Sequence, residues 1–229
     1  MSIRYWLTFT LQSEACFARG DGVPGVVDIE VNHDRYGLPF LGGRTLKGLL
    51  HADATEIVAA LRRSDPSLYQ KWAGVANTLF GQPGSLHDKA GCLHIGDARL
   101  PVDLRSQVVA NFDKLGLHRH EVLETLTTIR RQTAVDSRTG APKEDTLRAV
   151  RVIQRGTTFA APLILRGNWD DETKRQGALA FLAACTKAFR RAGSNKTRGY
   201  GLLTAELREQ ESGPAVTDAL FQPFKEDLQ

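Results

Sequence analysis

The residues best suited to chemistry lie in residues 189–201, which read FRRAGSNKTRGYG and carry the cations Lys196 and Arg198 among glycine, serine and threonine. Backbone N–H groups in such a segment can surround phosphate oxygens, and the two cations add positive charge. Residues 174–205 contain seven Lys or Arg and no Asp or Glu, in a chain whose net charge is only +4. This clustering predicts contact with phosphate or nucleic acid. The predicted contact residues are Ser194, Asn195, Lys196, Thr197 and Arg198.

An ordinary helix end explains part of this pattern. Cations near a helix C-terminus interact favourably with the helix dipole, and a glycine commonly follows the last helical residue. This alternative accounts for Arg190, Arg191 and Gly193. It leaves the two later cations and the following Gly-Tyr-Gly unexplained.

A second cationic segment precedes a predicted helix, where residues 38–48 read LPFLGGRTLKG. Thr45 is placed to cap a helix that runs to about Arg63, because a threonine hydroxyl accepts hydrogen bonds from the first N–H groups of a helix. A helix N-terminus that follows glycines can also bind an anion, so Arg44, Thr45 and Lys47 are further predicted contacts. A simple connection between a strand and a helix is the alternative.

Residues 127–155 read as two extended arms around a tip at residues 136–142, where turn-forming residues concentrate. The arms carry five arginines, a residue well suited to phosphate forks and to stacking on bases. A solvated hairpin is the alternative, but five arginines on two short arms exceed what solubility requires. The predicted nucleic-acid contacts on the arms are Arg130, Arg131, Arg148 and Arg151.

Composition limits the class of protein. With 229 residues, of which 41% are hydrophobic, the chain holds enough apolar side chains for a core, and we expect one domain over residues 1–229. Cys16, Cys92 and Cys185 lie far apart without a CxxC pair, which argues against a zinc site and a disulfide framework. No apolar run approaches the length of a membrane span. We therefore expect no zinc, no membrane partner and a cytoplasmic location.

Periodicity predicts the order of the elements. Residues 3–12 alternate between apolar and polar side chains, which is typical of a strand with one buried face. The further expected elements are a helix at 45–63, a loop-rich stretch at 64–88, a strand at 91–100, short helices within 105–126, the hairpin, a strand at 157–166, a helix from Asp170 or Asp171 to Arg191, and a strand at 201–207. Pro162 predicts that the strand at 157–166 is bulged or lies at an edge.

Without its insertions this order is β-α-β-β-α-β, an α+β ferredoxin-like (RRM-like) core with a projecting hairpin. Residues 209–229 form an acidic-leaning tail, to which the pattern assigns no element.

Several motifs in order resemble a known family. They are Asp28, the LPFLGGRTLKG segment, LFG at 79–81, GDARL at 96–100, GTTF at 156–159 and the glycine-rich segment at 193–201. Over about residues 3–208 this order resembles the RAMP superfamily of CRISPR-associated proteins. It is most similar to the backbone subunits of type III effector complexes.

The resemblance implies that copies of the chain stack along a CRISPR guide RNA (crRNA). The hairpin at 127–155 would be a thumb that kinks the guide and displaces a base at regular intervals. The segments at 193–201 and 42–48 would hold the guide backbone. The implied partners are crRNA, complementary target RNA, further copies of the chain and other CRISPR effector subunits.

The resemblance also implies a cleavage site. In cleaving family members, an acidic residue upstream of the LPFLGGRTLKG block supports metal-dependent cutting of bound target RNA, and Asp28 has that location. A carboxylate beside a displaced phosphodiester can hold Mg²⁺ (or Mn²⁺) and align the 2′-OH for attack. Asp21 is the runner-up, and a turn-capping role is the alternative for Asp28. Gly-Gly-Arg-Thr replaces the usual Pro-Gly-Ser-Ser, which leaves the complex subtype open.

Three other functions fit the same residues. The chain could be a crRNA-binding scaffold without catalysis, or an RNA-binding protein outside CRISPR systems. It could also be a metal-independent RNase that processes precursor crRNA, with His33 or His51 as general base. The thumb-like arms argue against the processing enzyme, because such enzymes generally lack that hairpin.

Overall fold

The structure, a computed structural model, describes residues 2–82, 90–134, 136, 138–141 and 146–229. Its strands are β1 (Ile3–Leu11), β2 (Leu93–Ile95), β3 (Thr127–Gln132), β4 (Arg148–Ile153), β5 (Thr158–Leu165) and β6 (Leu203–Arg208). Its helices are α1 (Gly43–Ser64), α2 (Pro66–Phe80), α3 (Val102–Asn111), α4 (Arg119–Leu126), α5 (Glu172–Ala188) and α6 (Thr217–Asp227). Within these residues, no helix is long and apolar enough to cross a membrane.

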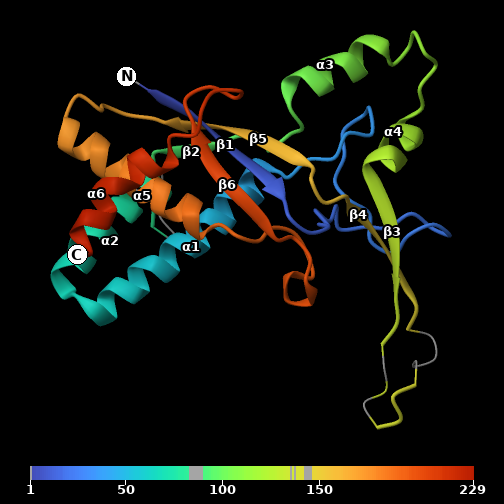
Figure 1. The fold of residues 1–229 in the computed structure, drawn as a ribbon, viewed down its shortest axis with the longest axis horizontal. Coiled ribbons are helices and arrows are strands. Elements are labelled where there is room, and N and C mark those ends of the chain that lie inside the picture. The colour runs from blue at the N-terminus through green and yellow to red at the C-terminus, as the bar shows by residue number, and fades with distance from the viewer. Residues whose placement is uncertain (1, 83–89, 135, 137, 142–145) are drawn as a thin grey trace.

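Four strands form one antiparallel sheet in the order β2-β5-β1-β6. Along the chain, β1, α1, β2, β5, α5 and β6 follow one another as β-α-β-β-α-β, which confirms the ferredoxin-like prediction. The helix α2 is inserted after α1, and α3, α4 and the hairpin β3–β4 are inserted between β2 and β5. The hairpin projects away from the sheet and the helices, as the sequence predicts (Figure 1).

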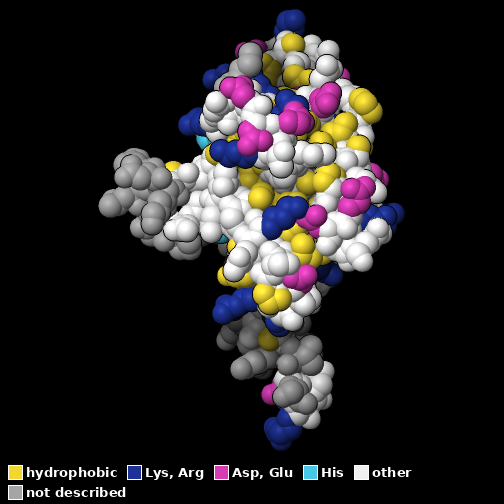
Figure 2. Space-filling view, turned by 90° about the vertical axis from the view of Figure 1, so that its left-hand side faces the viewer, with side chains coloured by type: hydrophobic (Ala, Val, Ile, Leu, Met, Phe, Trp, Pro, Cys, Tyr) yellow, Lys and Arg dark blue, Asp and Glu magenta, His cyan; other side chains and the backbone are white. Residues whose placement is uncertain are grey.

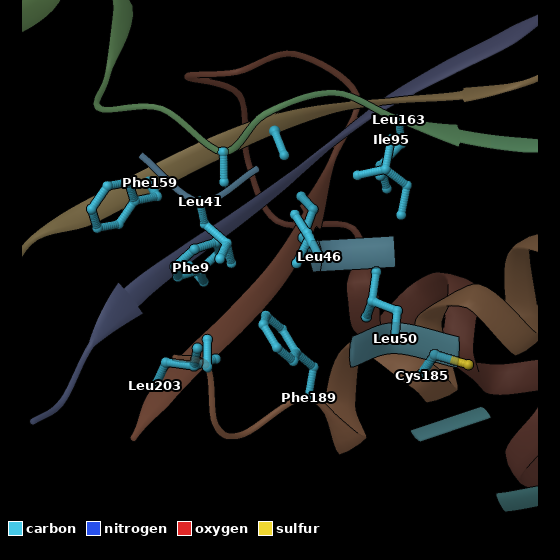
Figure 3. Packing of buried hydrophobic residues seen from close by; sticks show 14 of the residues in the cluster. Phe9, Leu41, Leu46, Leu50, Ile95, Phe159, Leu163, Cys185, Phe189 and Leu203 are labelled. Carbon is cyan, nitrogen blue, oxygen red and sulfur yellow. The ribbon is translucent and has the colours of Figure 1, made fainter. Parts of the chain in front are cut away.

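The core lies between the sheet and the helices α1 and α5. Alternate residues of β1, including Leu7 and Phe9, are fully buried and face these helices. The ring of Phe9 lies 5.4 Å from that of Phe159 on β5 and 5.8 Å from that of Phe189, measured between centroids. Leu46 and Leu50 of α1 point into the same space (Figure 3). The buried hydrophobic residues form one cluster that reaches from the sheet to the hairpin.

The prediction that the strand at 157–166 is bulged or lies at an edge is wrong. This strand, β5, lies between β2 and β1. The carbonyl of Pro162 accepts a hydrogen bond from the N–H of Gly96 at 2.9 Å, just beyond the last residue of β2. A proline has no N–H to donate to β2, but at this position β2 has already ended. A proline is tolerated there because no ladder bond is lost.

The loop-rich prediction for residues 64–88 is also wrong over its first part, since α2 occupies Pro66–Phe80, while residues 83–88 lie outside the described residues. Asp65 caps this helix by accepting hydrogen bonds from the N–H groups of Ser67 and Leu68, and Pro66 stands at its first position. The C-terminal tail forms α6, which packs on α5. The Phe224 ring of α6 lies 6.0 Å from that of Phe181 on α5 and 4.7 Å from that of Trp72 on α2, measured between centroids.

Thr45 does not cap α1, because the helix begins earlier, at Gly43. The N–H of Gly43 donates to the Asp97 carboxylate at 3.0 Å, so a side chain from beyond β2 replaces the predicted cap. A Cβ at position 43 would lie 2.4 Å from the carbonyl oxygen of Ile95, which explains why a glycine begins the helix. Other limits shift slightly: β2 is only Leu93–Ile95, and α5 ends at Ala188 with Asp171 as its N-cap.

A short segment before α1 supports the root of the hairpin. The N–H of Asp28 donates to the Ala149 carbonyl at 2.8 Å, and the N–H of Arg151 donates to the Ile29 carbonyl at 3.0 Å. At the tip, Asp136 accepts from two backbone N–H groups, which hold the pKa of its carboxyl below the usual value. The predicted tip residues Ser137 and Pro142 lie outside the described residues.

Candidate nucleic-acid interface

The glycine-rich segment forms a closed loop between α5 and β6. A 3-10 turn at Lys196–Arg198 follows Asn195, whose backbone is left-handed with φ of 58°. The guanidinium of Arg191 donates to the carbonyls of Lys196 at 2.8 Å and Tyr200 at 3.4 Å, so this arginine braces the loop from within. The side chains of Lys196 and Arg198 are exposed, and neither forms an ion pair with any described residue.

Two glycines make this closure possible. Gly193 has φ of +90°, and a Cβ there would lie 2.5 Å from the carbonyl oxygen of Cys16. Gly201 has φ of +74°, and a Cβ there would lie 1.9 Å from the carbonyl oxygen of Ala192. Both the backbone conformation and the close approach therefore require glycine. These positions fold the chain back so that the two cations point outward.

An acidic residue that the sequence analysis missed lies near the loop. Burial and, to a smaller extent, the charge of Glu56 raise the pKa of Asp53 on α1 to about 6, while Lys196 opposes the shift. The opposing effect of Lys196 shows that this lysine acts electrostatically on α1. Helical spacing places Asp53 on the same side of α1 as Thr45 and Leu49.

The predicted contact residues in the segment at 42–48 differ in whether they are free to reach a ligand. Arg44 and Thr45 are exposed at the start of α1. Lys47 instead donates to the carbonyl of Leu93 at 2.8 Å, and burial lowers the pKa of its amine. Burial acts to raise the pKa of Asp97, but hydrogen bonds from Gly43 and Arg99 outweigh it and hold that pKa below its usual value. The first N–H of α1 is thus occupied by this carboxylate.

The loop and the start of α1 meet at a cavity of about 210 Å³. Among its lining residues are Asn32, Phe40, Thr45, Leu49, Gly193 and Ser194. The structure therefore brings together two cationic segments that lie about 150 residues apart in the chain. We call this space the α1–loop cavity.

The hairpin adjoins the same loop. Strand register places Arg130, Gln132 and Arg148 on one face of the hairpin, where Gln132 donates to the hydroxyl of Tyr200 at 2.9 Å. Arg130 forms an ion pair with Glu14, whose carbonyl accepts the N–H of Gly201 at 2.7 Å. The Gln132–Tyr200 bond links the hairpin to the loop, so the hairpin face that carries Arg130 and Arg148 adjoins the glycine-rich loop.

The other two predicted arginines of the arms lie elsewhere. Arg131 lies on the opposite face and lines a cavity of about 270 Å³ with Asp28. Arg151 is only 6% exposed, and its Nε atom lies 3.0 Å from the carboxylate of Glu30, itself 2% exposed. The guanidinium also donates to the hydroxyl of Thr127 at 3.3 Å. Arg151 is therefore a structural residue of the hairpin root, and its burial corrects the prediction that it contacts RNA.

The two candidate catalytic acids differ in their surroundings. The Oδ2 atom of Asp28 accepts a hydrogen bond from the N–H of Ala149 at 2.6 Å, while Oδ1 has no partner among the described residues. Asp21 is exposed and pairs with Arg19 at 2.6 Å, and this hydrogen bond holds the pKa of its carboxyl below the usual value. Asp28 thus fixes β4 through one oxygen and keeps the other without a partner among the described residues, and it lines a cavity together with Arg131. Asp21, in contrast, is paired with Arg19.

The described residues contain no group of three or more His, Cys, Asp or Glu side chains that could hold a metal ion. Mg²⁺, however, commonly binds through one or two carboxylates together with phosphate oxygens and waters. The free Oδ1 of Asp28 fits an ion whose remaining ligands come from RNA and water. It does not fit a cage formed by protein alone.

The two candidate histidines have local partners. The Nδ1 atom of His33 lies 3.0 Å from the carbonyl oxygen of Asp34, and the ring of His51 stacks on Phe80 at 5.1 Å between centroids. Neither histidine lines the α1–loop cavity. Away from the hairpin, the side that carries the N-terminus shows hydrophobic, acidic and basic side chains intermixed (Figure 2). Mixed charge of this kind does not favour a polyanion.

Comparisons with known proteins agree with this fold. The sequence matches the model of the RAMP superfamily over residues 9–204. No curated protein matches significantly. A chain in the cryo-EM structure of the type III-B Cmr-beta bound to cognate target RNA is similar with a TM-score of 0.59 and 14% identity, over 90% of this chain and 96% of that one. A chain of the type III-B Cmr-beta apo state is similar with a TM-score of 0.59 and 13% identity, over 90% and 97%. The structural likeness supports the fold, and because the family match covers most of the sequence, the chain belongs to the RAMP superfamily.

Proposed function

We propose that the chain is a crRNA-binding backbone subunit of a type III CRISPR effector complex, and that copies of it line one guide RNA. The observation that carries the proposal is the hydrogen bond between Gln132 and Tyr200, which joins two groups of basic residues. One group is Arg130 and Arg148 on the hairpin face, the other is Lys196 and Arg198 on the glycine-rich loop, and together we call them the cationic surface. On this surface the exposed Lys196 and Arg198 have no acidic partner within ion-pair distance among the described residues. Membership of the RAMP superfamily and the fold shared with Cmr-beta chains support the same assignment.

The guide backbone would follow this surface. Lys196 and Arg198 would contact phosphates, because their charges point outward while Arg191 holds the loop that carries them. Asn195 and Thr197 would add hydrogen bonds from the same loop. Arg130 and Arg148 would extend the path along the hairpin. Contacts of this kind position RNA without reading its sequence.

Replacing Lys196 and Arg198 together with alanine is expected to weaken binding of single-stranded RNA about tenfold at physiological salt, whatever the sequence. A plot of log affinity against log salt should become shallower by about 1.4, since each phosphate contact on a single strand contributes about 0.7 to the slope. Filter binding of labelled RNA by the full chain over a range of salt concentrations measures both quantities.

The matched control is the exposed pair Arg62 and Arg63 at the other end of α1, which removes the same charge when both become alanine. This control should leave the slope unchanged. If both double variants lower the affinity and the slope equally, general charge would explain binding, and the loop would be only a helix end.

We further propose that the subunit cleaves bound target RNA at Asp28. A Mg²⁺ (or Mn²⁺) ion bound there would neutralise charge at the scissile phosphate. Asp28 would hold this ion through Oδ1, while its Oδ2 stays fixed by the backbone of β4. Arg131, which lines the same cavity, would attract the target phosphate.

Two alternatives remain testable. A scaffold subunit would bind guide and target with the same residues and leave cleavage to another protein. A metal-independent processing enzyme is less favoured, because His33 and His51 both lie outside the α1–loop cavity and have local partners. Cleavage that survives EDTA would support the processing enzyme over Asp28.

A further inference from the structure

The α1–loop cavity has polar side chains that the protein itself leaves unused. Asn32, Thr45 and Ser194 line it, and none of these three side chains has a hydrogen-bond partner among the described residues. Their backbones, in contrast, are fixed. The N–H of Asn32 donates to the carbonyl of Phe17 at 2.7 Å, and the N–H of Ser194 donates to the carbonyl of Cys16 at 2.8 Å. These side chains therefore stand on a fixed backbone around one small space, and their donors and acceptors are not used by any described residue.

The remaining wall of the cavity is apolar. Phe40, Leu41 and Leu49 line it, and Phe17 packs against Gly193, where a Cβ would lie 3.2 Å from its ring. The guanidinium of Arg99 lies 5.4 Å from the centre of the Phe40 ring and is itself held by Asp97, so the ring has a fixed orientation. Among the described residues, none of those that line the cavity is charged.

This combination matches the chemistry of a nucleobase. A base has flat apolar faces that stack on aromatic side chains, and its edge carries hydrogen-bond donors and acceptors. The amide of Asn32 offers both a donor and an acceptor, which is the pairing that amide side chains use on base edges. The hydroxyls of Thr45 and Ser194 can donate or accept, so they suit more than one base. The cavity volume of about 210 Å³ admits one such group and not a folded ligand.

The position of the cavity favours a base of bound RNA over a free small molecule. Two of its lining residues belong to the segments that carry exposed cations: Thr45 follows Arg44, and Ser194 lies in the loop of Lys196 and Arg198. A phosphate held at these cations would place its own nucleotide, or the next one, at the entrance. We propose that the α1–loop cavity binds one unstacked nucleobase of the RNA that the cationic surface holds. This inference rests on the proposed RNA-binding function and adds a base contact to it.

The test separates base contacts from phosphate contacts. Asn32→Ala is expected to weaken binding of a short labelled single-stranded RNA about tenfold, as loss of an amide–base contact does. The salt slope should not change, because Asn32 carries no charge. An RNA of the same length in which every nucleotide is abasic keeps its phosphates and sugars. The unaltered chain and the Asn32→Ala variant should bind that abasic RNA with the same weak affinity.

The matched control is Asn77→Ala, which changes an exposed asparagine on α2. It should bind both RNAs like the unaltered chain. Thr45→Val, which removes one hydroxyl without changing the size of the side chain, is a second variant and should show a smaller loss with the same unchanged slope. Circular dichroism checks that each variant is folded.

The outcomes distinguish the two proposals. If RNA binds with a salt slope that depends on Lys196 and Arg198 while Asn32→Ala and Thr45→Val bind like the unaltered chain, the base cavity is wrong and the RNA-binding function stands. If Asn32→Ala loses the same factor on abasic RNA, the residue acts through the fold and the base contact is again excluded. If the unaltered chain binds neither RNA, both proposals fail.

Discussion

Replacing Asp28 with asparagine is expected to slow cleavage of complementary RNA by at least about a hundredfold, the order of loss that follows removal of one preorganised electrostatic group. Asparagine keeps an oxygen that can accept the hydrogen bond from the N–H of Ala149, so the root of the hairpin should remain intact. It removes the negative charge that would hold a divalent ion. The measurement is cutting of a labelled target by the purified, guide-loaded complex with Mg²⁺ and with EDTA.

The control for this experiment is Asp21→Asn. Asp21 already pairs with Arg19, so its loss should leave cleavage within a few fold of the unaltered complex. Guide binding should persist in both variants. Cuts that vanish with EDTA but persist with Asp28→Asn would move the catalytic acid to another residue or subunit, and a guide-bound complex without any cuts would make the chain a scaffold.

Replacing Glu30 with alanine is expected to lower the free energy of unfolding by about 3–5 kcal/mol, because it leaves the guanidinium of Arg151 buried without its counterion. The two side chains are 2% and 6% exposed. Glu30 also accepts the N–H of Val31 at 2.8 Å, so its loss removes a second bond. Denaturant unfolding of the purified chain measures the change.

A double variant tests the reason for this loss. Glu30→Ala with Arg151→Met removes the charge as well as its partner, and should recover much of the stability, since apolar replacement of a buried pair is often neutral or better. The matched control is Glu14→Ala, which breaks the exposed pair with Arg130 and should cost far less. If the Glu14 and Glu30 variants lose equal stability, burial of the Arg151 pair does not govern the hairpin root.

The sequence predicted the core well because its signals are local. Alternation in residues 3–12 and the apolar spacing within α1 and α5 depend only on which side chains face the core. The order of these elements then leaves few arrangements for a single sheet. The hairpin was also predictable, because turn residues at its tip separate two arms of extended character.

Features that depend on distant neighbours were missed. Pro162 predicted a bulged or edge strand. The proline is tolerated in an inner strand because β2 ends at Ile95, so no N–H is needed from residue 162. Thr45 looked like a helix cap, but Asp97 takes the N–H that the cap would serve. In α2, the cap Asp65 and the following Pro66 were local signals that the sequence analysis did not use.

The candidate site shows the same limit. Lys196 and Arg198 are exposed, as contact with phosphate requires, and their contact with RNA stays a prediction. Arg151 could not be told from the other arginines of the arms, because its partner Glu30 lies 121 residues away in the chain. Asn32 carried no signal at all, as only the fold brings it to a cavity beside Ser194.

The most direct test of the proposed function is the number of chains that bind one RNA. Native mass spectrometry of the full chain with single-stranded RNA of increasing length should show steps of one 25.2 kDa subunit for each fixed increment of nucleotides. Such regular steps are what a subunit that lines a guide predicts. A single bound chain at every RNA length, or irregular masses without a fixed increment, would contradict it.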